Sequence, residues 1–142
     1  MAHQFSVKIY YEDTDAGGIV YYGNYLRYLE RARTEFLLDN GISVVEFHHQ
    51  GLFFAVTHVD IHYKRPARLG ETINITSEIA EMKNASVVLK SLILKNDTLL
   101  VEAYVTFACI DKDGKPKRLP GELRNLGSPE QGSTFPAVVP PT

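Results

Sequence analysis

Three acidic side chains stand just before a pair of glycines near the start of the chain. In the segment YYEDTDAGGIVYYGNYLRYLERAR, Asp15 is followed by Gly17 and Gly18, and an amphipathic run opens at Tyr22. The first N–H groups of a helix have no partner within the helix, and they lie at the positive end of its dipole. A carboxylate beside such a helix start can attack a carbonyl carbon or activate water, while the N–H groups bind the oxygen that becomes negative.

This arrangement indicates acyl transfer to water. Gly17 and Gly18 allow the backbone to turn tightly and a ligand to approach closely. The same residue types also occur in ordinary turns, where Asp13 and Asp15 would do no more than bind backbone N–H groups. Residue types alone leave both interpretations open.

The segment after the glycines has the period of an α-helix. A helix is predicted from about Tyr22 to Asn40, because apolar residues recur there at helical spacing: Tyr25, Leu29, Ala32 and Phe36. Gly41, just beyond the end, suits the residue that follows a helix. Ser43, with Glu46 in the third position after it, predicts the cap of a short second helix.

The remaining segments alternate between polar and apolar residues, as β-strands do. The predicted strands cover residues 6–11, 53–65, 72–80, 86–95 and 98–110. Short links between the last three predict an antiparallel meander. One strand, a long helix and four further strands predict an α+β fold, in which one curved antiparallel five-stranded sheet packs on the helix.

One domain is expected over residues 1–126, followed by a flexible tail over residues 127–142. The length of 142 residues is typical of a single domain. The last segment, GSPEQGSTFPAVVPPT, is rich in Pro, Gly and Ser and has no period.

Composition and charge exclude several classes of function. The net charge is −2 and no run of Lys or Arg occurs, so no nucleic-acid partner is expected. Cys109 is the single cysteine, which excludes an intrachain disulfide, and its place on an apolar strand face predicts an inert core thiol. No apolar stretch reaches the roughly 20 residues that span a bilayer, and no signal peptide is recognised. A cytoplasmic protein is expected.

Other polar residues are weaker candidates for a site. His58, Asp60 and His62 share one face of a predicted strand, but zinc needs three or four converging ligands, and an alternating strand turns its polar face to solvent. No metal site is therefore predicted. Glu30, on the long helix, is expected in a structural pair with a nearby Arg, and Asp13 is expected to be a turn or cap residue.

The opening motif is long and specific. YYEDTDAGGIVYYGNYLRYLERARTEFL closely resembles the leading motif of the hotdog-fold acyl-CoA thioesterases, in particular the 4-hydroxybenzoyl-CoA thioesterase-like branch that includes the Tol–Pal-associated thioesterases. YKRPARLGETINI resembles the Pro-Ala-Arg turn of that family, and Leu119-Pro120 resembles its C-terminal segment. The resemblance covers about residues 5–126 and implies the hotdog fold.

The resemblance implies roles for individual residues. Asp15 matches the catalytic carboxylate, as nucleophile or general base, and the backbone N–H of Tyr22 matches the donor to the thioester carbonyl. The Tol–Pal-associated branch commonly has His at the position of Tyr22, so aromatic and short aliphatic acyl groups both stay open. Arg65 and Arg68 could meet the phosphates of CoA, since Arg matches phosphate geometry; ordinary surface charge is the alternative.

The implied reaction is hydrolysis of an acyl-CoA to a carboxylic acid and free CoA. It needs no metal or redox cofactor, because CoA arrives as part of the substrate. Acyl carrier protein is the open alternative to CoA, and the family implies a homodimer or homotetramer with active sites at a subunit interface. Two other functions compete: a hydroxyacyl thioester dehydratase, for which residues 19–24 lack the needed His, and a non-catalytic module that binds acyl thioesters or partner proteins.

Overall fold

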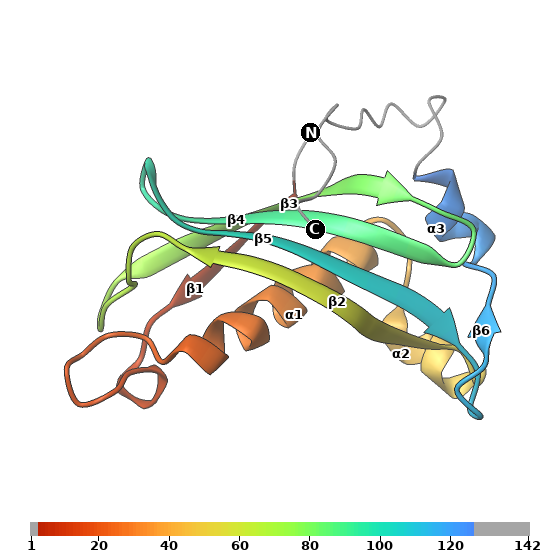
Figure 1. The fold of residues 1–142 in the computed structure, drawn as a ribbon, viewed down its shortest axis with the longest axis horizontal. Helices are drawn as coiled ribbons and strands as arrows, with labels where there is room; N and C mark the ends of the chain where they lie inside the picture. The colour runs from red at the N-terminus through yellow and green to blue at the C-terminus, as the bar shows by residue number, and fades with distance from the viewer. Residues whose placement is uncertain (1–2, 127–142) are drawn as a thin grey trace.

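A strongly curved antiparallel sheet wraps around one long helix (Figure 1). The computed structural model describes residues 3–126, and the predicted tail lies outside them. The elements in chain order are β1 (His3–Lys8), the 3-10 helix η1 (Tyr11–Asp13), α1 (Tyr22–Asp39), α2 (Val44–His49), β2 (Phe53–Tyr63), β3 (Thr72–Met82), β4 (Ser86–Lys95), β5 (Thr98–Ile110), β6 (Pro116–Lys117) and α3 (Gly121–Asn125).

The sheet has the strand order β1-β3-β4-β5-β2, and every neighbouring pair is antiparallel. The predicted α+β class, the five long strands and the β3–β4–β5 meander are confirmed. Three short elements were not predicted: η1, α3 and β6, which pairs with β5. All three are too short to show a period in the sequence.

The first strand lies three residues earlier than predicted, over His3–Lys8 rather than residues 6–11. Ile9 still bonds to the neighbouring turn, because its N–H donates to the Glu71 carbonyl at 2.8 Å. At Tyr10 the chain leaves the sheet, since the Asp13 carboxylate accepts the Tyr10 N–H at 2.8 Å and η1 begins at the next residue. Alternation of residue types cannot reveal such a side-chain contact.

The core lies between α1 and the concave face of the sheet. The predicted apolar stripe of α1 is buried, together with Tyr28 and Leu37. Small side chains occupy the middle of the facing sheet: Ser77 pairs with Ser91, Ser91 pairs with Ala103, and the two hydroxyls lie 3.0 Å apart. Tyr28 packs in the same buried cluster as Ala103, so small residues in the sheet leave room for tyrosines on the helix.

The cap of α2 and the buried cysteine agree with the sequence analysis. The Ser43 hydroxyl accepts the Glu46 N–H at 3.2 Å and so caps α2. Cys109 is fully buried, and this burial raises the pKa of its thiol to about 11. Among residues 3–126, no helix is long and apolar enough to cross a membrane.

Two adjacent leucines of α1 test this packing. Leu37 is 1% exposed and belongs to the core, whereas Leu38 is 51% exposed. Leu37→Ala should lower the free energy of unfolding by about 2–5 kcal/mol, because it leaves a cavity. Leu38→Ala, the same change one residue further on, should stay within about 0.5 kcal/mol of the native protein. Urea denaturation measures both, and equal losses would contradict the assigned faces of α1.

Candidate functional site

Asp15 lies in the loop between η1 and α1, and one of its carboxylate oxygens is held by the backbone of that loop. Asp15 Oδ1 accepts the N–H of Gly17 at 2.8 Å and that of Ile19 at 3.3 Å. Gly18 has a φ of +74°, a conformation that favours glycine. Within the described part of the chain, Oδ2 takes no hydrogen bond, so this oxygen remains available for chemistry.

The Asp15 loop is fixed against the turn between β2 and β3. The N–H of Val20 donates to the Ala67 carbonyl at 2.9 Å, and the N–H of Leu69 donates to the Gly18 carbonyl at 2.9 Å. Figure 1 shows the loop and this turn at the same end of the molecule. Backbone hydrogen bonds within the loop and to the β2–β3 turn therefore fix the position of the Asp15 carboxylate.

The start of α1 carries no side-chain cap. Tyr21 precedes the first helical residue, and no side chain accepts a hydrogen bond at this end. In residues 3–126, the N–H groups of Tyr22 and Gly23 donate to no protein acceptor. Asp13 instead serves η1 and the loop, as expected of a cap residue: its carboxylate accepts the Tyr10 N–H. The helix start thus offers two backbone donors beside the Asp15 loop.

A small aromatic cavity of about 220 Å³ opens next to this helix start. Three tyrosines contribute to its wall, and the ring of Tyr63 lies 4.8 Å from that of Tyr22 and 5.4 Å from that of Tyr25, centroid to centroid. The Tyr25 hydroxyl accepts the Ala67 N–H at 3.0 Å. Burial raises the pKa of both Tyr25 and Tyr63, so their hydroxyls stay neutral near pH 7.

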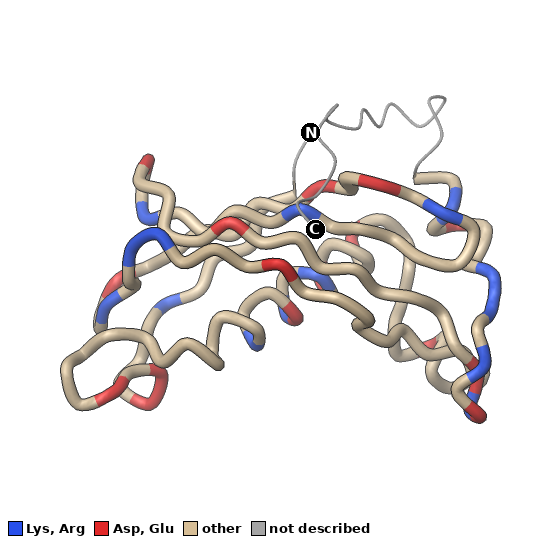
Figure 2. Tube along the Cα trace, viewed as in Figure 1, with Lys and Arg blue, Asp and Glu red and all other residues tan. Residues whose placement is uncertain are grey.

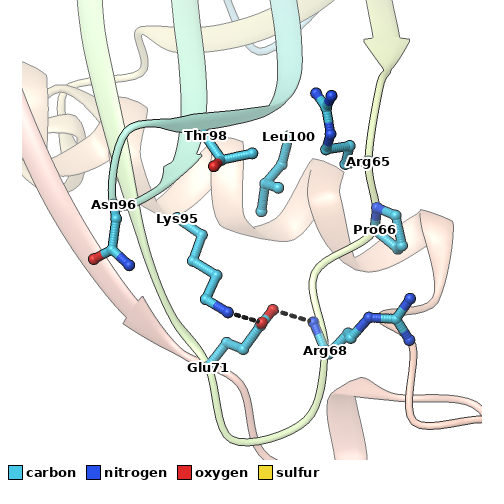
Figure 3. A pocket seen from close by; sticks show the side chains of 8 residues that line it. All are labelled: Arg65, Pro66, Arg68, Glu71, Lys95, Asn96, Thr98 and Leu100. Carbon is cyan, nitrogen blue, oxygen red and sulfur yellow. Dashed lines mark hydrogen bonds and ion pairs between the residues drawn. The ribbon is translucent and has the colours of Figure 1, made fainter.

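A second, basic cavity of about 500 Å³ adjoins the aromatic one, and Arg65 and Pro66 line both. Its floor carries an ion pair between Lys95 and Glu71, and Glu71 also accepts the Arg68 N–H at 2.7 Å (Figure 3). Desolvation raises the pKa of Glu71, but the bonds from Lys95 and Arg68 outweigh it and hold that pKa below its usual value.

Arg65 and Arg68 keep their charge available at the mouth of this basic cavity. Neither guanidinium forms an ion pair within residues 3–126, and Figure 3 shows both pointing away from Glu71. Figure 2 shows basic segments at both ends of the molecule, and one of these ends carries the acidic loop before α1. The Lys95 charge is matched by Glu71, so the two arginines supply the net positive charge here.

Other candidates from the sequence do not converge. Asp60 and His62 pair at 3.0 Å on the outer face of β2, and no three potential ligands among the described residues could hold a metal ion. Glu30 accepts a hydrogen bond from the Thr34 hydroxyl at 3.4 Å. Within residues 3–126 it forms no ion pair with an arginine, which was the expected partner. Tyr63 was missed as a site residue, although its place on the apolar face of a predicted strand pointed it toward α1.

A sequence profile of the thioesterase-like superfamily matches residues 10–134. The chain belongs to this superfamily. It is 38% identical to the acyl-CoA thioesterase YbgC of Haemophilus influenzae over 122 residues, which cover 84% of this chain and 90% of that protein. It is 40% identical to the acyl-CoA thioester hydrolase YbgC of Escherichia coli O6:H1, with coverage of 84% and 91%.

Solved structures agree with this family. A probable thioesterase from Bartonella henselae superposes with a TM-score of 0.80 at 37% identity, covering 84% of this chain and 100% of that one. The predicted hotdog fold, the thioesterase family and the enzyme class of thioester hydrolase are confirmed. On this thioesterase fold, the chain has the Asp15 loop, the uncapped start of α1 and the two adjoining cavities at one end of the molecule.

Proposed function

We propose that the protein is an acyl-CoA thioesterase in which Asp15 and the start of α1 carry out the hydrolysis. One observation carries this proposal. The Asp15 carboxylate, which is held by backbone N–H groups, lies in the loop just before a helix whose first N–H groups have no acceptor in the described residues. The names of the Haemophilus and Escherichia relatives support the substrate class. The products are a carboxylic acid and free CoA.

The chemistry divides between the two groups. The thioester carbonyl oxygen accepts hydrogen bonds from the N–H of Tyr22 and of Gly23, which stabilise the negative charge of the tetrahedral intermediate. Asp15 Oδ2 either takes a proton from the attacking water or attacks the carbonyl carbon itself. In the first route the proton passes from Asp15 to the sulfur as the carbon–sulfur bond breaks, and CoA leaves as the thiol. In the second route the bond breaks to give a mixed anhydride on Asp15 and the CoA thiolate. Water then hydrolyses the anhydride, which frees the acid, restores the Asp15 carboxylate and supplies the proton that converts the thiolate to the thiol. Gly17 and Gly18 give the acyl group close access to the loop.

Arg65 and Arg68 are proposed to bind the phosphates of CoA. Both guanidinium groups are exposed at the basic cavity, and planar guanidinium groups match phosphate oxygens. No cofactor beyond the substrate is proposed, and acyl carrier protein stays the alternative carrier of the acyl group.

A homodimer or homotetramer in the cytoplasm is part of the same proposal. β2 lies at one edge of the sheet, with Val56 46% exposed and Val59 36% exposed. An exposed apolar edge strand favours pairing with another chain. Asp15 is also exposed in a single chain, so a second subunit would complete the wall of the site.

Removing the carboxylate charge tests the catalytic role. Asp15→Asn keeps an oxygen that accepts the Gly17 N–H, so the loop should hold its shape. Thiol release from acyl-CoAs should fall about 10²–10⁴-fold, the usual contribution of a positioned acid or base. Glu12→Gln, an exposed carboxylate in the same segment, is the matched control and should keep native activity.

Two results would overturn this catalytic proposal. Asp15→Asn with native turnover would remove Asp15 from the mechanism. A native protein that binds acyl-CoAs but releases no thiol from short, long or aromatic thioesters would instead favour the non-catalytic binding module.

The phosphate role of the arginines is separable from chemistry. Arg65→Ala and Arg68→Ala should each raise KM for an acyl-CoA about 2- to 5-fold, as expected for an exposed charge pair, with kcat unchanged. The same variants should hydrolyse the corresponding acyl-pantetheine, which lacks the nucleotide phosphates, at the native rate. Equal changes in the kinetics of both substrates would show that the arginines do not bind the phosphates.

A further inference from the structure

The aromatic cavity is built from three separate parts of the chain. Tyr22 and Tyr25 come from α1, Tyr63 ends β2, and Pro66 belongs to the following turn. Ile19 adds an apolar side chain from the Asp15 loop. The cavity therefore takes shape only when the loop, the helix and the β2–β3 turn are packed together.

The volume of this cavity suits one small group. It measures about 220 Å³. An engineered apolar cavity of about 150 Å³ in another protein holds a benzene molecule, whereas whole ligand sites usually measure about 300–1,000 Å³. This volume matches one aromatic ring and is smaller than a long alkyl chain requires.

The ring geometry leaves aromatic faces for a ligand. Tyr25 is 1% exposed and is fixed by the Ala67 N–H, so it forms the base of the cavity. Tyr22 is 66% exposed and Tyr63 is 42% exposed, and their planes meet at 46°. Aromatic pairs favour centroid separations of about 4.5–7 Å in offset or tilted arrangements, which a third ring can extend.

The cavity adjoins both reacting groups. Tyr22 supplies a wall ring and also one of the unpaired N–H groups of the helix start. Ile19 supplies a wall side chain, and its N–H holds Asp15 Oδ1 at 3.3 Å. In the proposed function the thioester carbonyl lies at the helix start, so a group that fills this adjoining space is the acyl group.

We propose that Tyr63 is a specificity-determining residue, and that with Tyr22 it selects acyl groups that carry an aromatic ring. This inference rests on the proposed function, because it names the acyl class for the same site. The preference comes from contact between rings in the small cavity.

Binding of two non-hydrolysable thioether analogues tests the inference without requiring turnover. Phenacyl-CoA and 2-oxooctyl-CoA carry the same number of acyl carbons, one set as a ring and one as a chain. The native protein should bind phenacyl-CoA more tightly in titration calorimetry. Tyr63→Leu should lower the affinity for phenacyl-CoA about 2- to 12-fold, which corresponds to the strength of one aromatic pair. The affinity for 2-oxooctyl-CoA should stay within about 2-fold of the native value.

Two variants serve as controls for the loss of the ring. Tyr63→Phe keeps the ring and should keep the native preference. Tyr11→Leu removes a tyrosine that is 79% exposed and outside the cavity, and it should change neither affinity. Thermal unfolding of each variant checks that the fold is intact.

If Tyr63→Leu lowers the affinities for both analogues and for CoA itself by the same factor, the inference is overturned, because that pattern would place adenine in the cavity. An unchanged preference in Tyr63→Leu would overturn it as well. Failure of the proposed function gives a different pattern: no thiol release by the native protein, with the difference in affinity between the two analogues still dependent on Tyr63.

Discussion

The site depends on the way Asp13 fixes the start of α1. Its carboxylate accepts the Tyr10 N–H at 2.8 Å, and its carbonyl accepts the Tyr21 N–H and the Asn24 side chain, each at 3.1 Å. One residue thereby joins the end of β1 to the beginning of the helix. Because no capping side chain accepts a hydrogen bond at the helix start, the Gly23 N–H stays unpaired within residues 3–126, as does the Tyr22 N–H of the first helical residue.

Part of the proposed selection comes from an element of the fold that takes no part in the proposed chemistry. The loop before α1 contributes the Asp15 carboxylate and backbone donors, whose positions depend on main-chain bonds to the β2–β3 turn. The end of β2 contributes Tyr63, a side chain that takes no part in the proposed bond-breaking step. Substitutions at the end of β2 can therefore alter the preferred acyl group while the hydrolytic groups keep their geometry.

Sequence patterns predicted most of the fold, because helical and strand periods are local. β4 and β5 have the predicted bounds, and the motif placed Asp15 beside the start of α1 at Tyr22. The limits of β1 were wrong because they depend on the Asp13 side chain. Strand alternation places Tyr63 on the apolar face that meets α1. Its contact with Tyr22 could not be predicted, because it also depends on the irregularity between Val56 and His58 and on the packing of β2 against α1.

The most direct test removes the Tyr22 N–H without disturbing the helix. Proline is tolerated at the first helical position, and Tyr21 has φ −64° and ψ 134°, which suits the residue before proline. Tyr22→Pro and Tyr22→Ala both lose the ring, but only the first loses the N–H. Thiol release from one acyl-CoA should be about 10²–10³-fold slower in Tyr22→Pro than in Tyr22→Ala. Equal rates would contradict a role for the Tyr22 N–H in hydrolysis.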